Sequence, residues 1–199
     1  RFTTFLEGDT METVNHNRLS VLKSEFGILP KKGHYIVALA GNPNVGKSTV
    51  FNALTGLHQH TGNWPGKTVN NAQGSFTHKN KSFLLIDLPG TYSLMTQSAE
   101  EEIARDFICF GQPDVTIVVV AASCLERNLN LALQVMEITP RVLVCVNLLD
   151  EAKKKNIHIN TEALSSKLGV PTVGTVARTG KGLEELREAI YKVAVGIVV

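Results

Sequence analysis

The fold is decided by the stretch Gly41-Asn42-Pro43-Asn44-Val45-Gly46-Lys47-Ser48, which fits the pattern G-x-x-x-x-G-K-[ST]. An apolar run at 35–40 precedes it and predicts a buried strand, and a helix is predicted at 47–54 directly after it. In this context, glycines let the backbone curl until successive N–H groups surround phosphate oxygens, while the helix N-terminus adds partial positive charge. A plain glycine-rich turn is the alternative, but the strand–loop–helix context favours a phosphate-binding loop, or P-loop.

The P-loop predicts contacts with a bound nucleotide and its metal ion. Lys47 is expected to reach the β- and γ-phosphates, and the Ser48 hydroxyl is expected to ligate magnesium. The predicted nucleotide-binding residues of this segment are Gly41, Asn42, Pro43, Asn44, Val45, Gly46, Lys47, Ser48 and Thr49.

The rest of the chain alternates between strand and helix patterns. Strands are predicted at 35–40, 71–78, 82–87, 115–120, 142–146 and 171–175. Helices are predicted at 18–26, 47–54, 99–110, 128–138, 161–168 and 183–195. This order predicts an α/β fold with a mostly parallel six-stranded sheet and helices on both faces. Residues 1–33 are interpreted as an N-terminal extension or linker without an assigned function, and residues 34–199 as one domain.

Composition narrows the class of protein. Hydrophobic residues make up 43% of the chain and charged residues 19%, which excludes wholesale disorder, and the net charge of +2 gives no reason to expect a nucleic-acid partner. The apolar run Val115–Ala122 is far shorter than the roughly 20 residues that span a membrane, so we expect a soluble chain. Because the chain begins with Arg1 rather than Met, we expect a fragment of a longer protein. Cys109, Cys124 and Cys145 are expected to be free thiols, which suits a reducing cytosol. Cys124 and Cys145 are expected to be buried, because they lie beside or within apolar runs.

A second motif, Leu85-Ile86-Asp87-Leu88-Pro89-Gly90, ends an apolar strand with an acid and then a glycine. Asp87 is expected to hold magnesium through water, and the Gly90 N–H is expected to sense the γ-phosphate. A strand followed by an aspartate and a turn is common by itself, but at this distance after a P-loop it indicates a nucleoside triphosphatase.

Two further segments predict recognition of a guanine base. In Asn147-Leu148-Leu149-Asp150, the last carboxylate is expected to accept both N–H donors on the guanine edge, an arrangement that adenine cannot supply. A helix cap is the alternative for this aspartate, and Leu148 stands where such motifs usually carry lysine. Val176-Ala177-Arg178 matches the loop whose backbone N–H contacts the guanine oxygen, with Val176 in place of the usual serine. The predicted base-binding residues are Asn147, Asp150, Ala177 and Arg178.

Residues 55–68 are rich in glycine and polar side chains and are predicted to form a mobile loop, the first switch. The Thr68 hydroxyl is expected to meet magnesium when GTP is bound. Trp64 is interpreted either as an exposed partner contact or lid, or as a side chain packed on the domain. His58 and His60 suggest a metal site, but such sites need three or four ligands, so a solvated loop is favoured.

Taken in order, these elements resemble the Ras-like P-loop GTPase fold. The sequences of four segments indicate a more specific resemblance. The segments 41–48, Thr61-Gly-Asn-Trp-Pro-Gly-Lys-Thr68, Asp87-Leu-Pro-Gly-Thr-Tyr-Ser93 and Asn147-Leu-Leu-Asp-Glu-Ala-Lys153 resemble the N-terminal GTPase (G) domain of the ferrous iron transport protein B family. The resemblance implies that residues 34–199 form a G domain that binds GTP with Mg²⁺, hydrolyses it slowly to GDP and regulates a ferrous iron membrane transporter. It also implies a location at the cytosolic face of the cell membrane, with the helical and transmembrane permease domains of the parent protein as partners.

Two other function classes remain as alternatives. A ribosome-assembly GTPase shares the core motifs but usually carries an RNA-binding domain or a basic face, and the segment Asn63-Trp64-Pro65-Gly66 argues against it. A nucleotide-binding module without useful catalysis is the second, and four intact residues argue against it: Lys47, Ser48, Thr68 and Asp87.

Catalysis needs a group that these motifs do not supply. Thr91 stands where Ras-type enzymes place the water-orienting glutamine, and no arginine occurs between Gly41 and Gly90. An arginine finger is worth roughly 10³ to 10⁵ in rate, so a substitute is expected, either Lys67 or a bound potassium ion. Asn44 of the P-loop offers a side-chain oxygen next to the phosphates, and G domains of the resembled family that carry this asparagine are potassium-activated. We therefore expect K⁺ to be held by Asn44 and by backbone carbonyls near Asn63 and Trp64. The predicted catalytic residues are Asn44, Lys47, Thr68 and Gly90, and the predicted magnesium ligands are Ser48, Thr68 and Asp87.

Overall fold

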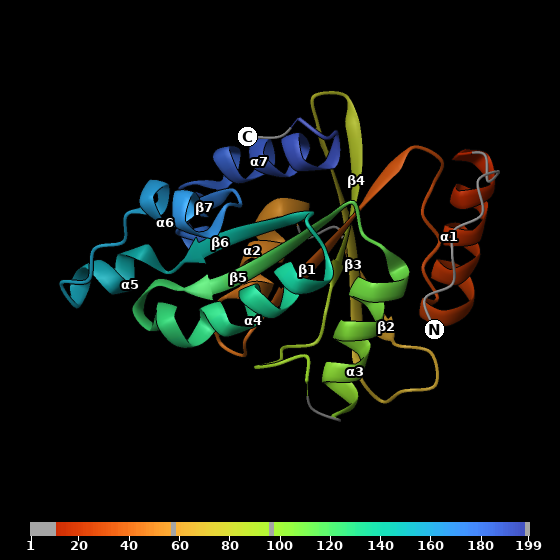
Figure 1. The fold of residues 1–199 in the computed structure, drawn as a ribbon, viewed down its shortest axis with the longest axis horizontal. Coiled ribbons are helices and arrows are strands. Elements are labelled where there is room, and N and C mark those ends of the chain that lie inside the picture. Colours follow the sequence, from red (N-terminus) through yellow and green to blue (C-terminus); the bar gives the residue numbers. More distant parts are fainter. Residues whose placement is uncertain (1–10, 57–58, 96–97, 198–199) are drawn as a thin grey trace.

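A computed structural model describes residues 11–56, 59–95 and 98–197, and its centre is a seven-stranded sheet in the order β2-β3-β4-β1-β5-β6-β7 (Figure 1). Strand β1 pairs in parallel with β4 and β5, and β6 pairs in parallel with β5 and β7. Strands β2 and β3 are antiparallel to their neighbours. The strands are β1 (His34–Gly41), β2 (Gln59–Asn63), β3 (Asn70–His78), β4 (Lys81–Asp87), β5 (Val115–Ala121), β6 (Val142–Asn147) and β7 (Thr172–Gly174).

The α/β class and the mostly parallel sheet are confirmed, but the sheet has one strand more than the six predicted. The additional strand, β2, lies inside the segment that was predicted to be a loop. It runs at the edge of the sheet, where Gln59 is opposite Gly74 and Asn63 is opposite Asn70. An edge strand held by backbone hydrogen bonds on one side needs no alternating apolar side chains, so its sequence carries no strand pattern.

The helices largely follow the predicted ranges. They are α1 (Met11–Phe26), α2 (Lys47–Thr55), α3 (Ala99–Asp106), α4 (Leu125–Ile138), α5 (Leu149–Lys154), α6 (Thr161–Leu168) and α7 (Leu183–Ala194). The helix predicted at 99–110 is divided, because α3 passes into a π-helical turn, η1 (Phe107–Gly111). Two 3₁₀ turns follow β5 and precede α7, at η2 (Ala122–Cys124) and η3 (Ala177–Thr179). Helix α5 was not predicted, because six residues are too short to show a helical period.

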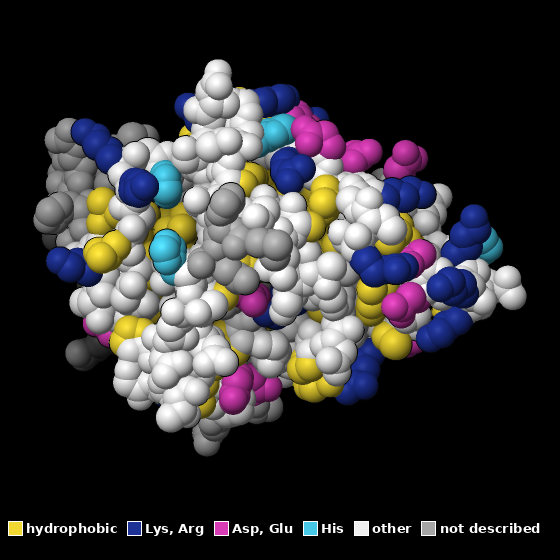
Figure 2. Space-filling view, turned by 180° about the vertical axis from the view of Figure 1, so that it is seen from behind, with side chains coloured by type: hydrophobic (Ala, Val, Ile, Leu, Met, Phe, Trp, Pro, Cys, Tyr) yellow, Lys and Arg dark blue, Asp and Glu magenta, His cyan; other side chains and the backbone are white. Residues whose placement is uncertain are grey.

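Apolar side chains on both faces of the sheet form two cores. One face is covered by α1, α3, η1 and α4, and the other by α2 and α7 (Figure 1). All seven residues of β5 are buried, as expected for a central strand with helices on both sides. Basic side chains on the face drawn in Figure 2 are most numerous toward the end made by α5 and α6, and acidic side chains lie among them.

Helix α1 packs against the sheet and η1 at the opposite end of the molecule from α5 and α6 (Figure 1). Arg18 donates two hydrogen bonds of 3.0 Å to the carboxylate of Asp114, which also accepts from the Ile36 backbone N–H at 2.7 Å. Leu22 and Phe26 are buried in the same core as the sheet. The segment interpreted as an extension therefore contributes to the hydrophobic core, while the domain boundary at residue 34 stays a prediction.

Two smaller expectations concern the cysteines and the membrane. Cys145 is buried, and burial raises the pKa of its thiol to about 12, with a smaller opposing effect from a hydrogen bond with Thr175. Cys124 is exposed, so the prediction that it is buried was wrong; it lies in η2, beyond the end of the apolar strand β5. Among the described helices, none combines the length and the hydrophobicity that a membrane span requires.

Candidate functional site

The P-loop joins β1 to α2 in a tightly curled conformation. Gly46 precedes the first residue of α2 with φ of 80°, and Asn44 also has a positive φ of 65°. A Cβ atom on Gly46 would lie 2.4 Å from Nδ2 of Asn147, and one on Gly41 would lie 2.8 Å from the Val119 carbonyl oxygen. Only glycine fits at these two positions, as predicted for a loop that turns its backbone N–H groups toward one ligand.

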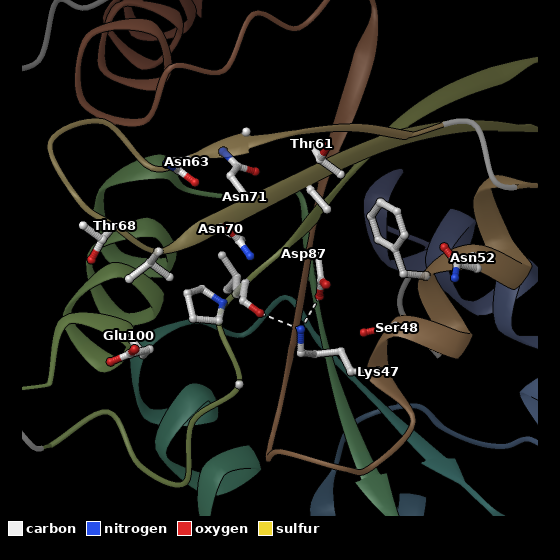
Figure 3. A pocket seen from close by; sticks show the side chains of 17 residues that line it. Lys47, Ser48, Asn52, Thr61, Asn63, Thr68, Asn70, Asn71, Asp87 and Glu100 are labelled. Carbon is white, nitrogen blue, oxygen red and sulfur yellow. Dashed lines mark hydrogen bonds and ion pairs between the residues drawn. The ribbon is translucent and has the colours of Figure 1, made fainter.

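Lys47 and Asp87 come from the two predicted phosphate motifs and lie in contact (Figure 3). Lys47 Nζ forms an ion pair with the Asp87 carboxylate and donates a 2.6 Å hydrogen bond to the Leu88 carbonyl oxygen. Burial raises the pKa of Asp87, and the neighbouring Lys47 ammonium works against that rise. The structure therefore brings together the cation that was predicted to bind phosphate and the carboxylate that was predicted to hold magnesium.

A cavity of ≈ 1030 Å³ surrounds this ion pair. Its walls come from the P-loop, the first switch and the end of β4, and they include Ser48, Asn63, Thr68 and Gly90. In Figure 3, Thr68 and Ser48 lie on opposite sides of the cavity with Asp87 between them. The volume is that of an ordinary small-molecule site, and the walls are polar enough for a phosphate-bearing ligand.

The oxygen atoms around the cavity suit a magnesium ion. The hydroxyls of Ser48 and Thr68 and the carboxylate of Asp87 all line it, and Mg²⁺ prefers one or two protein oxygens together with water and phosphate oxygens. Among the described residues, no three His, Cys, Asp or Glu side chains gather into a metal cage. His60 is an exposed residue of β2, and His58 lies outside the described residues.

Asn147, one of the predicted base-binding residues, links two loops at the end of β6. Its side chain is almost fully buried, and Nδ2 donates a 3.1 Å hydrogen bond to the Val45 carbonyl oxygen of the P-loop. Its Oδ1 accepts from the Ala177 backbone N–H at 3.1 Å and from the Thr175 hydroxyl at 3.0 Å. Thr175 was not identified from the sequence, because a single threonine before a loop carries no signal of its own.

Asp150 and Arg178 lie beside each other at the same end of the sheet. Arg178 donates a 3.2 Å hydrogen bond to the Asp150 carboxylate, although its own side chain is mostly exposed. Burial works to raise the pKa of Asp150, but hydrogen bonds from Arg178 and from backbone N–H groups together lower it. Leu148, in place of the usual lysine, adopts a left-handed φ of 62° at the start of α5 and lies close to Gly46.

The groups predicted to complete catalysis occupy different surroundings. Asn44 is exposed on the P-loop, whereas Trp64 is only 2% exposed. Lys67 points to α3, where it pairs with Glu102 at 3.0 Å. The Thr91 hydroxyl donates to the Ser93 carbonyl oxygen at 2.5 Å, so it serves its own loop. Of the two interpretations of Trp64, the structure has the packed one.

Both polar atoms of the Asn42 side chain are buried in the P-loop without a hydrogen-bond partner among the described residues. An unpaired buried amide costs about 1–3 kcal/mol. The P-loop therefore retains hydrogen-bonding capacity that the described residues do not use.

Comparison with known proteins gives one family. The sequence model of the family described as ferrous iron transport protein B matches residues 35–190. The chain is 48% identical over 158 residues to the Fe(2+) transporter FeoB of Shigella flexneri, an alignment that covers 77% of this chain and 20% of that protein. The corresponding transporter of Salmonella typhimurium is 47% identical with the same coverage. The chain thus spans about a fifth of the length of the curated relatives that it matches.

Solved structures agree with this match. The G domain of the T. maritima FeoB iron transporter is 46% identical with a TM-score of 0.77, covering 81% of this chain and 99% of that one. The FeoB G domain of Methanococcus jannaschii is 43% identical with a TM-score of 0.72, covering 81% and 98%. The cytosolic domain of the T. maritima protein in its GMPPNP form is 47% identical with a TM-score of 0.75, covering 80% and 64%.

Proposed function

The chain belongs to the ferrous iron transport protein B family, and from this premise we propose that it is a G domain that binds guanine nucleotides with magnesium and hydrolyses GTP. The contact between Lys47 and Asp87, in a cavity also lined by Thr68 and Gly90, carries the proposal. These residues come from separate motifs, and the fold brings them to one cavity in which a single ligand can contact them all. The ribosome-assembly alternative is not favoured, because the family and structure matches are to iron transporters.

The parent protein supplies the biological setting of this proposal. The relatives are Fe(2+) transporters of which this segment is about a fifth. We infer that nucleotide binding here regulates iron passage through a membrane-spanning permease of the same polypeptide, at the cytosolic face of the membrane. The helical and permease domains are the proposed partners, and no nucleic acid is involved.

The groups proposed to bind phosphate and magnesium, Lys47 and Asp87, contact each other in this structure. The P-loop N–H groups face the phosphates, and Lys47 exchanges its bonds with Asp87 and Leu88 for bonds to the β- and γ-phosphate oxygens. Asp87, released from Lys47, accepts hydrogen bonds from metal-bound water. Ser48, Thr68 and Asp87 would hold the magnesium ion, which would supply positive charge to neutralise the charge that develops on the transferred phosphoryl group.

Recognition of the base is assigned to the end of β6 and the loop at η3. The Asp150 carboxylate is kept ionised by its partners and accepts the two N–H donors of guanine. The loop at η3 is held by the hydrogen bond from the Ala177 N–H to Asn147, and we propose that the backbone of this loop contacts the guanine oxygen. Arg178 holds Asp150 in place. Asp150→Asn exchanges an acceptor for a donor and should shift the preference toward xanthine nucleotides. Equal affinity of the wild-type chain for ATP and GTP would contradict the assignment.

Hydrolysis requires an attacking water and stabilisation of charge. The Gly90 N–H is proposed to contact the γ-phosphate, and Asn44 to hold a potassium ion beside the phosphates, together with backbone carbonyls near Asn63 and Trp64. Potassium then takes the place of an arginine finger, which is worth roughly 10³ to 10⁵ in rate. The pairing of Lys67 with Glu102 supports this choice over Lys67 as the finger.

Phosphate release from GTP and ATP, each in potassium and in sodium, tests the proposal. GTP hydrolysis should exceed ATP hydrolysis and should be faster in potassium. Asn44→Ala should erase the difference between the cations while leaving GDP binding largely intact, and Thr68→Ala should impair hydrolysis while sparing GDP binding. If Lys67→Ala stops hydrolysis and the two cations behave alike, the lysine replaces potassium in the proposal.

A further inference from the structure

Trp64 of the first switch packs into a pocket of aromatic rings that includes Phe26 of the N-terminal helix α1. Its ring lies edge-on to Phe26, with centroids 6.1 Å apart, and to Phe107 of η1, with centroids 5.8 Å apart. Phe26 and Phe107 are in turn 5.1 Å apart. Helix α1 lies outside residues 35–190, the part that matches the family. A segment outside the shared domain therefore contacts the loop that carries Thr68.

Two backbone hydrogen bonds connect Trp64 to the residues on either side of Thr68, so a displacement of Thr68 is transmitted to Trp64. The Lys67 N–H donates to the Trp64 carbonyl oxygen at 3.0 Å around Pro65 and Gly66, whose φ is 67°, as in a type II turn. The Trp64 N–H donates to the Val69 carbonyl oxygen at 2.9 Å and closes the loop. The ion pair of Lys67 with Glu102 fixes the same turn to α3.

This anchored arrangement keeps Thr68 away from the P-loop. Thr68 and Ser48 lie on opposite sides of the cavity (Figure 3), yet the proposed function requires both hydroxyls to ligate one magnesium ion. Because these hydrogen bonds connect Trp64 with the residues around Thr68, closure over the nucleotide pulls on Trp64. The indole Nε1 of Trp64 is buried without a hydrogen-bond partner among the described residues, so leaving the pocket restores a hydrogen bond to water.

We propose that Phe26 is a positioning residue for the GTPase reaction: through Trp64 it holds the first switch open, and GTP must draw Trp64 out of its pocket to close it. The proposal rests on the proposed function, in which Thr68 joins the metal only in the GTP state. GDP lacks the γ-phosphate and leaves Trp64 in place. Helix α1 thereby lowers the affinity for GTP relative to GDP.

Intrinsic fluorescence tests this directly, because Trp64 is the single tryptophan of the chain. With magnesium and a non-hydrolysable GTP analogue, the emission of the 199-residue chain should shift to longer wavelength and become accessible to acrylamide. With magnesium and GDP it should stay unchanged. Binding of the analogue without any change in emission would overturn the inference alone, whereas failure of the analogue to bind would overturn the proposed function as well.

A pair of variants on α1 separates positioning from loss of stability. Phe26→Ala should raise the affinity for the GTP analogue about fivefold relative to that for GDP, and should shift the emission before any nucleotide is added. Leu22→Ala removes a fully buried side chain of the same helix that is not among the rings around Trp64. It should lower thermal stability and leave the affinity ratio and the emission unchanged. An equal effect of the two substitutions on the affinity ratio, or no effect of Phe26→Ala, would refute the positioning role.

Discussion

The Asn147 side chain donates a 3.1 Å hydrogen bond to the Val45 carbonyl oxygen, and so connects the end of β6, where we propose that the base binds, to the P-loop. The same amide accepts from the Ala177 N–H, which extends the connection to the loop at η3. Three segments that are far apart in the sequence are thus positioned by one buried residue. Asn147 can therefore support the predicted nucleotide binding by holding these segments in place, without contacting the base itself.

Asn147→Ala should weaken the binding of GDP and GTP alike. The substitution leaves the Val45 carbonyl and the Ala177 N–H without partners, at about 1–3 kcal/mol for each buried group, while the Thr175 hydroxyl keeps its hydrogen bond with Cys145. A loss of about tenfold or more in affinity is expected, measured by titration with fluorescent nucleotides. Asn128→Ala is the control, since Asn128 is also buried and accepts from the Ala121 N–H at 2.8 Å. That variant should lose stability with nucleotide affinity preserved; the reverse ranking would contradict the role given to Asn147.

Gly46→Ala should abolish nucleotide binding and destabilise the fold. The new Cβ would lie 2.4 Å from Asn147 Nδ2, at a backbone φ of 80° that alanine adopts only with strain. Gly169→Ala isolates the strain, because Gly169 has φ of 71° and no atom within 4 Å of the added methyl group. The control should cost about 1 kcal/mol in urea unfolding, and Gly46→Ala distinctly more. Similar losses in the two variants would show that the Gly46–Asn147 contact adds nothing.

Lys47→Met should increase the pH dependence of the stability of the nucleotide-free protein. Burial already raises the pKa of Asp87, and removal of the opposing Lys47 charge raises that pKa further. The folded protein then binds a proton more tightly than the unfolded chain does, so its stability decreases as the pH rises through the raised pKa. Urea unfolding between pH 5 and pH 8 measures this effect, which we expect to approach about 3 kcal/mol at the upper end.

The double variant Lys47→Met with Asp87→Asn provides the control for this pH dependence. Asparagine removes the uncompensated charge while keeping the shape of the side chain, so stability should recover and its pH dependence should vanish. A single variant whose stability is flat across this range would show that Asp87 is not the titrating group.

Glu188 should contribute stability that is lost in acid. Hydrogen bonds from Lys79 and His78 lower its pKa from 4.5 to about 2. Because the pKa is lower in the folded protein, the contribution is complete above pH 4.5 and disappears as the pH falls toward 2. Unfolding free energies measured from pH 6 to pH 2 should therefore fall less steeply for Glu188→Gln than for the wild type. Glu185→Gln alters an exposed carboxylate of the same helix and should follow the wild-type curve.

The sequence was sufficient wherever a local pattern determines the structure. β5 is a run of β-branched residues that is buried throughout, and α6 begins and ends where the pattern placed it. The P-loop could be located because its glycines are required by backbone geometry alone. Asp87 could be placed beside Lys47 because the carboxyl ends of parallel strands meet at one edge of a sheet.

Features that depend on distant neighbours could not be predicted in this way. The burial of Trp64 requires Phe26 and Phe107, which lie 38 positions before it and 43 after it, and no spacing rule connects them. Strand β2 is set by its pairing with β3 rather than by its own residues. The pairing of Arg178 with Asp150 likewise follows from the packing of two loops that sequence patterns treat separately.

The bidentate pair of Arg18 with Asp114 also orders events during synthesis, because its two residues are 96 positions apart. The ribosome therefore makes α1 well before it makes Asp114 and the ring of Phe107. Until then Leu22 and Phe26 lack the part of the hydrophobic core that Phe107 contributes. Helix α1 therefore leaves the ribosome before the residues that it packs against, and it reaches its native place only after they have been made.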